Sequence, residues 1–349
     1  MISRKLRVGV AGLGFIATGR HLPVWARLND VELAGVCDVS GDAVDKAVRQ
    51  FNASAGYSDL AEMIEKADLD IIDLCTPPKT HASMATIAME RGCHVLMEKP
   101  MAITSAECNQ LVECAANNKV KLSVIHNMLH YPPVLRALEL VRNGTLGEFR
   151  GMRLLIANPT DEYLAKDTWV HQLPGGLIGE TGPHIVYLSL PFIGKVKQVF
   201  AHSRKMSNFD WASADDFTVE LVGEKGSSSI RVVHNSDHWS GDLEIWGTTG
   251  KVKVDLQAMI MTRYSRRNRG HATVGLSVVN ESFGKIRQLA SNTLNIKAGR
   301  FKSGHERIIE EFARSVKEDL PPPVSAESAA ETVTVLEEIV RQLDRNGAS

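Results

Sequence analysis

Short apolar runs alternate with amphipathic stretches through the first third of the chain. Continuous apolar runs are typical of strands buried on both faces of a parallel sheet, and the amphipathic stretches between them fit the helices that cover such a sheet. The expected strands are residues 6–11, 31–38, 70–75, 95–97 and 121–125, and the expected helices are residues 42–51, 58–66, 81–91 and 104–118. This order predicts an α/β domain, built on a doubly wound parallel sheet, over residues 1–125.

The second part of the chain, residues 126–349, has a different pattern. Several of its expected strands are joined by glycine-bearing turns of the kind found in β-hairpins. These strands are residues 149–156, 196–202, 216–222, 229–234, 242–246 and 250–256, and helices are expected over residues 133–143, 304–317 and 325–343. A second domain that combines helices with hairpin-linked strands follows from this order.

A glycine-rich turn follows the first expected strand. Gly12, Gly14 and Ala17 form the pattern G-x-G-x-x-A. In this fingerprint the first glycine permits a tight turn, the second lets a pyrophosphate approach the backbone, and the small third residue lets a helix pack on the strand. Asp38 ends the second strand about 20 residues later, where a carboxylate can accept hydrogen bonds from the ribose hydroxyls of NAD. Together these features predict dinucleotide binding.

Asp38 also bears on which dinucleotide binds. A carboxylate at this position would repel the extra phosphate of NADP. No arginine stands among the next three residues, Val39 to Gly41. NAD is therefore the expected cofactor, while NADP stays open because Lys46 could pair with its phosphate.

A charged pair, Glu98 and Lys99, ends the apolar run of residues 95–97 and is followed by Pro100. In open parallel sheets the ligand binds outside the carboxyl ends of the strands, so Lys99 is expected to point at it. Pro100 restricts Lys99 to extended conformations and would fix the direction of the amine. The alternative is an ordinary surface lysine at an exposed strand end.

Composition limits the classes of partner. The formal net charge of −1 gives no general reason to expect nucleic acid or an anionic membrane as partner. No stretch approaches the ~18 apolar residues of a membrane span. The cysteines have no Cys-x-x-Cys spacing, so they are expected to be reduced core residues of a cytoplasmic protein. They are Cys37, Cys75, Cys93, Cys108 and Cys114.

The Gly12 fingerprint, Asp38 and the Lys99 motif, together with further motifs, resemble those of the glucose–fructose oxidoreductase, inositol dehydrogenase and rhizopine catabolism (Gfo/Idh/MocA) family. The tripeptide Glu98-Lys99-Pro100 is the most specific part, and the resemblance covers nearly the whole chain. The matching features are Gly12-x-Gly14-x-x-Ala17 with His21, Asp38, Thr76-Pro77-Pro78-x-x-His81, the run from Gly92 to Pro100, and the run from Gly175 to His184 that includes Glu180.

The resemblance implies a two-domain fold, in which an N-terminal Rossmann domain precedes a C-terminal α/β domain with a large open, mostly antiparallel sheet. It also implies NAD(P)-dependent oxidation of a secondary hydroxyl on a sugar, sugar derivative or cyclitol, and a homodimer or homotetramer formed through the C-terminal sheet. Lys99 matches the catalytic lysine and His184 the catalytic or substrate-binding histidine. Glu180 and Tyr187 stand where many members have aspartate, and these departures concern substrate contacts.

Hydride transfer from a hydroxyl-bearing carbon needs a base that takes the hydroxyl proton, and Lys99 and His184 are the candidates. Glu180 lies four residues before His184, so on a helix the two share a face and the carboxylate could orient the imidazole. Pro183 would require that helix to begin near Gly182, or the pair to bridge a loop–helix junction. The alternative is an ordinary surface ion pair.

The remaining expected contacts follow from the fingerprint, the strand-end loops and the polar, aromatic segments of the second domain. The expected cofactor-binding residues are Gly12, Gly14, Phe15, Ile16, Asp38, Thr76, Pro77, His81, Glu98 and Lys99. The candidate substrate contacts are Asn127, Tyr163, Trp169 and Tyr187.

Two other functions stay open at this point. One is redox-assisted glycoside cleavage, in which NAD is transiently reduced and then regenerated, and the other is a non-catalytic NAD-binding regulator. No metal site is expected, because His234, Asp237 and His238 lack a proper set of ligands. The basic residues of segments 263–269 and 285–302 fit a phosphate grip, an amphipathic surface helix over residues 281–294, or a solvated face.

Overall fold

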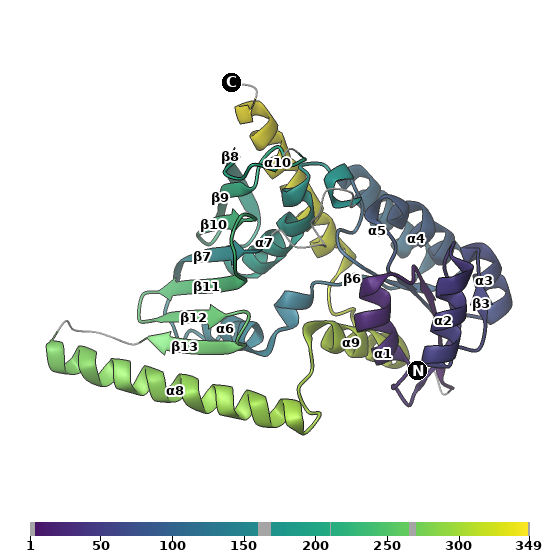
Figure 1. Cartoon of the computed structure of the whole chain (residues 1–349), viewed down its shortest axis with the longest axis horizontal. Coiled ribbons are helices and arrows are strands. Elements are labelled where there is room, and N and C mark those ends of the chain that lie inside the picture. Colours follow the sequence, from purple (N-terminus) through teal and green to yellow (C-terminus); the bar gives the residue numbers. More distant parts are fainter. Residues whose placement is uncertain (1–3, 160–168, 210, 265–269, 348–349) are drawn as a thin grey trace. The chain divides into compact units, whose positions relative to one another are not determined.

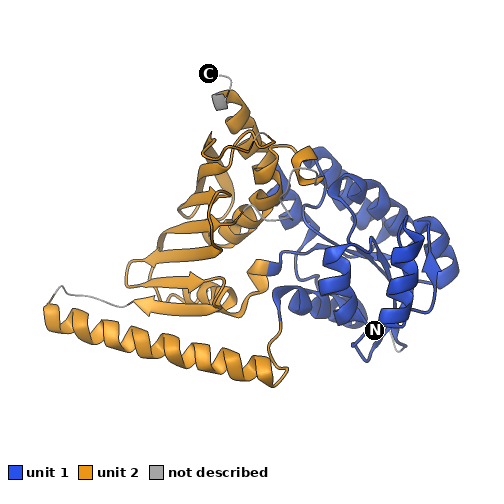
Figure 2. Cartoon of the chain, in the orientation of Figure 1, with its two compact units in different colours: residues 1–127, 303–334 blue, residues 128–302, 335–349 orange. Residues whose placement is uncertain are grey.

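The computed structural model describes residues 4–159, 169–209, 211–264 and 270–347. The chain divides into two compact units, shown in Figure 2. Unit 1 contains residues 1–127 and 303–334, and unit 2 contains residues 128–302 and 335–349. The expected division at residue 125 assigned every later residue to the second domain, whereas residues 303–334 lie in unit 1.

Unit 1 is built on a six-stranded parallel sheet with the strand order β3-β2-β1-β4-β5-β6, which confirms the predicted doubly wound sheet (Figure 1). Almost every residue of the four central strands is buried, as expected for a sheet covered on both faces. The strands are β1 (Leu6–Ala11), β2 (Val31–Cys37), β3 (Gly56–Tyr57), β4 (Ile71–Leu74), β5 (His94–Met97) and β6 (Leu122–Val124).

Local capping fixes where the helices of unit 1 begin. In α5 (Ser105–Asn118), the Thr104 hydroxyl accepts a hydrogen bond from the Glu107 amide while the Glu107 carboxylate accepts from the Thr104 amide, which is a complete capping box. Side chains also cap α2 (Gly41–Phe51) and α3 (Leu60–Ala67). The other helical segments are η1 (Ala17–His21), α1 (Leu22–Trp25), η2 (Pro78–Thr80) and α4 (His81–Glu90).

Two late helices explain why residues 303–334 belong to unit 1. Helix α9 (Gly304–Glu318) begins after the Ser303 cap and buries Ile308, Ile309 and Phe312 in the core of unit 1. Helix α10 (Ala326–Gly347) adds residues up to Val333 to the same core, and its later residues join the core of unit 2. The hydrophobic pattern predicted both helices but not which core they enter.

Unit 2 is built on a seven-stranded sheet with the order β13-β12-β11-β7-β10-β9-β8. All neighbours are antiparallel except β7 and β10, so the expected mostly antiparallel sheet is confirmed. The strands are β7 (Phe149–Ala157), β8 (Val196–Arg204), β9 (Asp216–Gly223), β10 (Ser227–Val233), β11 (Ser240–Gly247), β12 (Lys251–Asp255) and β13 (Ile260–Tyr264).

The helices of unit 2 differ sharply in burial. Helix α7 (Leu177–Ile193) is buried on nearly every side, and α6 (Pro132–Arg142) buries one face. Short 3₁₀ turns, η3 (Asn127–His130) and η5 (Trp169–Gln172), precede these helices. Helix α8 (His271–Lys297) has no buried residue and runs beside the edge strand β13 (Figure 1). It is longer than the amphipathic helix expected over residues 281–294.

In the part of the chain that the structure describes, no helix combines the length and the apolar character needed to cross a membrane.

Candidate active site

The turn after β1 lets a ligand approach the backbone closely. Gly12 has a φ of +86°, and a Cβ there would lie 2.7 Å from the backbone of Cys75 and Thr76. A Cβ on Gly14 would meet no atom within 4 Å, so its backbone borders open space. Ile16 packs on the core of unit 1, and Phe15 is 77% exposed. This geometry fits a pyrophosphate held against the turn.

Asp38 follows β2 and faces this turn. One carboxylate oxygen accepts a hydrogen bond from the Leu13 amide at 2.7 Å, and the other accepts from the Ser40 amide at 2.9 Å. Each oxygen has a further lone pair, so the carboxylate can still accept hydrogen bonds from ribose hydroxyls. Asp38 therefore shapes the turn, a role that was not predicted, and its contact with a ribose stays a prediction.

A buried cluster of charged side chains lies beneath the carboxyl ends of β4 and β5. The Nδ1 atom of His21 is 2.8 Å from the Asp73 carboxylate, and its Nε2 atom is 3.0 Å from the Glu98 carboxylate. The indole of Trp25 also donates to Asp73, at 2.6 Å. Because both ring nitrogens of His21 face carboxylates, both must donate, and His21 is an imidazolium.

The charges of this cluster shift its pKa values. Burial is the largest single effect and would lower the pKa of His21, but the charge and hydrogen bond of Asp73, together with the interactions with Cys75, outweigh it and raise that pKa well above its usual range. Burial would likewise raise the pKa of Glu98, but hydrogen bonds from His21 and His305 hold it well below its usual range. The Nε2 atom of His305, on α9, lies 3.5 Å from Glu98. Each charged form is thus stabilised by its partner.

The π-helical turn η1 accounts for the position of His21, which is its last residue and is fully buried. Such turns are rare and often occur at functional sites. His21, Glu98 and His305 have ligand atoms within 4.8 Å of one another, as do His21, Asp73 and Cys75. These are metal-binding residue types, but hydrogen bonds between opposite charges already account for their arrangement.

Glu98 anchors the loop that carries Lys99. Its second carboxylate oxygen accepts a hydrogen bond from the Lys99 amide at 3.1 Å, and Lys99 itself is half-buried. The ring nitrogens of His81 lie 2.9 Å from the Pro100 carbonyl and 2.8 Å from the Thr76 carbonyl. His81 thereby joins two strand-end loops.

These contacts refine the expected set of cofactor-binding residues. The Glu98 carboxylate and the His81 ring are buried and hold loops in place, so we assign them supporting roles. Thr76 is half-buried and Pro77 is exposed at the edge of the sheet where the ligands of parallel sheets bind. Their contact with the cofactor stays a prediction.

In unit 2, His184 lies on α7 beside Tyr187. The Tyr187 hydroxyl is 2.6 Å from His184 Nδ1 and accepts a hydrogen bond from the Met128 amide at 3.2 Å. A tyrosine hydroxyl can donate its proton while it accepts a hydrogen bond, so it can donate to Nδ1 while it accepts from Met128. This direction leaves the proton of a neutral imidazole on Nε2. Tyr187 is buried and orients His184, a role that the sequence did not predict.

Glu180 lies one turn before His184, inside the same helix. Helix α7 begins at Leu177, so the expectation that Pro183 would delay the helix to Gly182 is wrong. Two glycines with positive φ precede the helix, and a buried apolar sequence supports it despite the missing amide of Pro183.

The Glu180 carboxylate is buried and accepts a hydrogen bond from the Thr181 hydroxyl at 3.3 Å. That hydroxyl lies 3.2 Å from Nε2 of His234. Burial lowers the pKa of His234 to about 4, so its ring is neutral at ordinary pH. Glu180 therefore belongs to a buried polar chain and is not part of a surface ion pair.

The other expected residues are placed as follows. Asn127 is buried in η3, and Trp169 packs against the core of unit 2 at the start of η5. Tyr163 lies outside the described residues. His238 is exposed and contacts Ser236. The structure therefore gives no support to Asn127 or Trp169 as substrate contacts, which stay predictions.

Replacing His21 by alanine should lower the free energy of unfolding by about 3–5 kcal/mol, because it leaves two buried carboxylates without their shared cation. The matched variant His238→Ala removes an exposed imidazole and should change stability by less than about 0.5 kcal/mol. Urea unfolding of both variants measures the difference. Equal effects would show that the cluster does not stabilise the fold.

The same cluster has a pH signature. The pKa of His21 is raised in the folded protein. Its contribution to the free energy of unfolding is therefore complete below the pKa of an unfolded histidine, about 6.5, and is lost as the pH rises through the pKa of the folded protein. The unfolding free energy of the wild type should therefore fall with rising pH more steeply than that of His21→Ala. Parallel pH profiles would contradict the assignment.

Family models match both parts of this chain, and one relative matches it over nearly its whole length. The model described as the oxidoreductase family with an NAD-binding Rossmann fold matches residues 6–126, and the GFO/IDH/MocA C-terminal domain model matches residues 134–283. The myo-inositol 2-dehydrogenase of Thermotoga maritima is 24% identical over 92% of this chain and 91% of that protein.

Two further relatives extend the comparison. The structure of the WlbA dehydrogenase from Bordetella pertussis, in complex with NADH and UDP-GlcNAcA, has a TM-score of 0.83 at 21% identity, over 99% of this chain and 97% of that one. A glycosyl hydrolase family 109 protein of Shewanella sp. (strain ANA-3) is 34% identical over 39% of this chain and only 32% of its own length. The two family models and the shared fold together show that this chain belongs to the Gfo/Idh/MocA family of NAD-binding oxidoreductases.

Proposed function

We propose that the chain is an NAD-dependent dehydrogenase that oxidises a secondary ring hydroxyl of a sugar, sugar derivative or cyclitol. The observation that carries this proposal is the position of Lys99, at the carboxyl end of β5, on a loop held by the buried carboxylate of Glu98. The names of the relatives support the substrate class, since one is an inositol dehydrogenase and another was solved with a nucleotide sugar.

The residues of unit 1 fit the cofactor. Gly12 lets the turn pack tightly on the backbone of Cys75 and Thr76, Gly14 leaves the backbone open to a pyrophosphate, and Asp38 offers acceptor oxygens to ribose hydroxyls. Bound NAD would accept the hydride from the carbon that bears the hydroxyl. The charge of Asp38 favours NAD over NADP, because a 2′-phosphate would meet a carboxylate.

The protein's own groups handle the proton. Lys99, in its neutral form, takes the hydroxyl proton as the C–O bond becomes a carbonyl, and it returns the proton in the reverse reaction. His184 assists as a hydrogen-bond donor, because the contact with Tyr187 leaves its proton on Nε2. Such a donor stabilises the negative charge that develops on the reacting oxygen.

A second candidate function is redox-assisted glycoside cleavage. The observation that favours it is the 34% identity to a family 109 glycosyl hydrolase, over about two fifths of this chain. This reaction would break a glycosidic bond without net accumulation of NADH. Incubation of the protein and NAD with glycosides, followed by assays for both free sugar and NADH, separates the two functions.

We also propose that the protein is a cytoplasmic homodimer or homotetramer that assembles through the sheet of unit 2. All five cysteines are free thiols, which fits a reducing compartment. The outward side chains of the sheet form ion pairs such as Arg153–Glu244 and Lys253–Asp242, so this interface would be polar.

Replacing Lys99 by alanine should lower turnover by a factor of about 10² or more while NADH still binds, because the base is lost. Lys99→Arg should be equally inactive, because arginine keeps the charge but does not release its proton. The control Lys79→Ala changes an exposed lysine of the neighbouring loop and should keep activity. NADH formation on a panel of cyclitols, sugars, glycosides and nucleotide sugars measures this, and an active Lys99→Ala enzyme would refute the assignment.

Replacing Asp38 by asparagine should lower the ratio of the NADPH to the NADH dissociation constant by about ten-fold, because it removes the charge that repels a 2′-phosphate. Asparagine has one acceptor oxygen, so it can keep the hydrogen bond from the Leu13 amide and loses the one from the exposed Ser40 amide. Fluorescence titrations with both cofactors measure the ratio, and Asp42→Asn, on the exposed first turn of α2, is the control. An unchanged ratio would show that Asp38 does not select the cofactor.

A further inference from the structure

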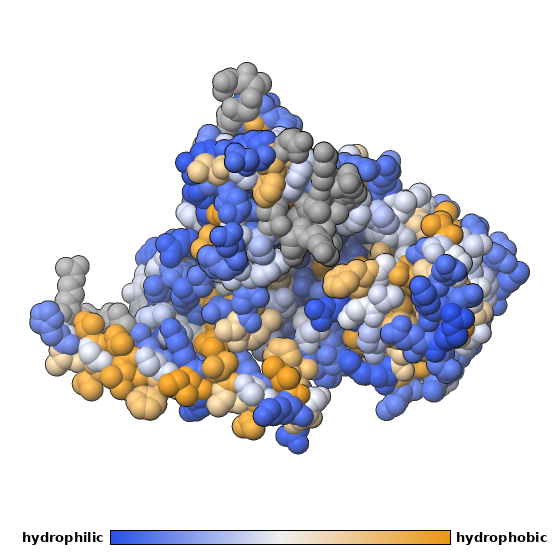
Figure 3. Space-filling view, viewed as in Figure 1, coloured by the Kyte–Doolittle hydropathy of each residue, from blue (hydrophilic) through white to orange (hydrophobic). Residues whose placement is uncertain are grey.

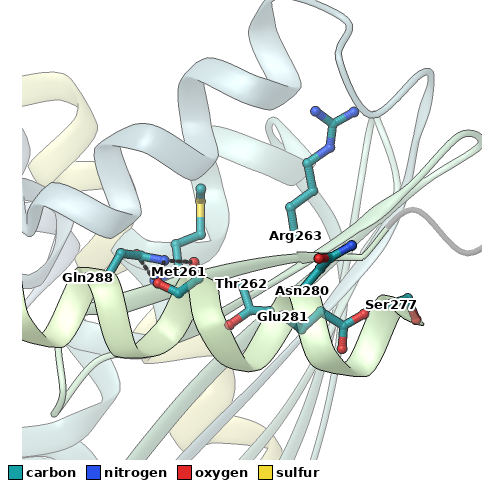
Figure 4. A pocket seen from close by; sticks show the side chains of 8 residues that line it. Met261, Thr262, Arg263, Ser277, Asn280, Glu281 and Gln288 are labelled. Carbon is teal, nitrogen blue, oxygen red and sulfur yellow. Dashed lines mark hydrogen bonds between the residues drawn. The ribbon is translucent and has the colours of Figure 1, made fainter. Parts of the chain in front are cut away.

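Helix α8 turns its polar side toward the rest of unit 2. The side-chain amide of Gln288 accepts a hydrogen bond from the Met261 amide at 3.0 Å and donates one to the Met261 carbonyl at 2.8 Å (Figure 4). Asn292 donates to the Met259 carbonyl at 2.9 Å. These bonds pair the backbone amide and carbonyl of Met261 on the free edge of β13. A pocket of about 210 Å³, lined also by Ser277 and Glu281, lies along the same side. The helix is therefore held by its polar residues.

The apolar residues of α8 face solvent. No residue of this 27-residue helix is buried, and Figure 3 shows hydrophobic side chains gathered along it. Several follow one another at intervals of three and four positions, so they share one side of the helix. The exposed apolar residues are Leu276 (68%), Val278 (46%), Val279 (50%), Phe283 (68%), Ile286 (64%), Leu289 (52%), Leu294 (67%) and Ile296 (60%).

This orientation is the reverse of that of an ordinary surface helix, whose apolar stripe faces the core. Soluble monomers rarely expose a contiguous apolar patch of this extent unless it binds something. At about 1.5 Å per residue the helix is about 40 Å long, so the apolar side is a long, narrow strip. A strip of this shape suits a flat apolar surface.

The charge of residues 263–302 indicates the chemistry of the surface that the apolar strip of α8 would contact. Residues 263–302 contain nine lysines and arginines and a single acid, Glu281, so the segment carries +8 while the rest of the chain carries −9. Lys285 and Arg287 lie on opposite borders of the apolar strip, given the spacing of about 100° per residue on a helix. Long basic side chains in such positions can reach phosphates while their stems cover apolar surface.

The same helix of a second copy is the less suitable partner for this strip. A two-fold symmetric pairing of α8 with itself would bring two segments of +8 together, which costs electrostatic energy. An anionic lipid surface neutralises the same charges and also takes up the apolar strip. The net charge of −1 for the whole chain hides this local separation of charge.

We propose that α8 binds flat in the interface of an anionic membrane, with its apolar strip in the boundary between headgroups and acyl chains. Phe283 and Ile286 lie near the middle of the strip and enter the lipid, while Lys285 and Arg287 contact lipid phosphates. Unit 2 remains attached to the helix through Gln288 and β13. Binding of this kind is peripheral and reversible.

Flotation of the full chain with vesicles tests this proposal. Vesicles of phosphatidylcholine with about 30% phosphatidylglycerol should bind the wild type at least about ten-fold better than pure phosphatidylcholine vesicles, and added salt should weaken binding. The double variant Phe283→Glu with Ile286→Glu should reduce binding to anionic vesicles by about ten-fold or more.

The matched control is Met206→Glu with Trp239→Glu, which removes two other exposed apolar side chains of unit 2 and adds the same charge. It should bind vesicles more weakly than the wild type by no more than about two-fold, since neither position lies on α8 and exposed charges are screened by salt. NADH titration and circular dichroism verify that both double variants are folded. The proposal is wrong if the wild type does not bind anionic vesicles, or if it binds both kinds of vesicle equally. It is also wrong if the variant Phe283→Glu with Ile286→Glu binds anionic vesicles as well as the wild type does.

The oligomeric mass provides the remaining check. Light scattering after gel filtration should give the same mass for the wild type and for Phe283→Glu with Ile286→Glu. A lower mass for this variant would show that a second copy covers the strip, and the membrane proposal would then be wrong.

Discussion

The arrangement of unit 1 depends on one buried cation, the imidazolium of His21, held between the carboxylates of Asp73 and Glu98. The three side chains come from η1 and from the end regions of β4 and β5, so the interaction joins parts of the chain far apart in sequence. Removing the cation would leave like charges buried near each other, which is costly in a low-dielectric interior. Because Glu98 is held in this position, its carboxylate can accept the hydrogen bond from the Lys99 amide that anchors the Lys99 loop.

A chain of positioning contacts leads from that cation to the proposed base, Lys99. Glu98, fixed by His21, accepts the Lys99 amide, and His81 joins the next loop to Pro100. In unit 2 the Tyr187 hydroxyl performs the equivalent task for His184. In each unit a residue with a proposed chemical role is oriented by a more deeply buried neighbour, which is how a protein holds reactive side chains in one geometry.

Much of the fold could be predicted from sequence because its signals are local. The apolar runs, the Gly12 fingerprint and the Thr104 cap each depend on residues near one another in the chain, and the structure confirms the elements they predict. The site was only partly predictable. The Glu-Lys-Pro motif predicts a role for Lys99, but the contact between Glu98 and His21 that anchors its loop depends on packing between residues 77 positions apart. The late helices were predicted by periodicity, while their division between two cores was not, since an apolar face does not specify its partner.

The central claim, that His21 is a buried imidazolium that fixes the Lys99 loop, is tested most directly by nitrogen NMR of histidine-labelled protein. At about pH 8, well above the ordinary histidine pKa of about 6.5, this account predicts that both ring nitrogens of His21 still carry protons. The signal is assigned by its loss in His21→Ala. A neutral His21 ring at that pH, with one nitrogen unprotonated, would contradict the account.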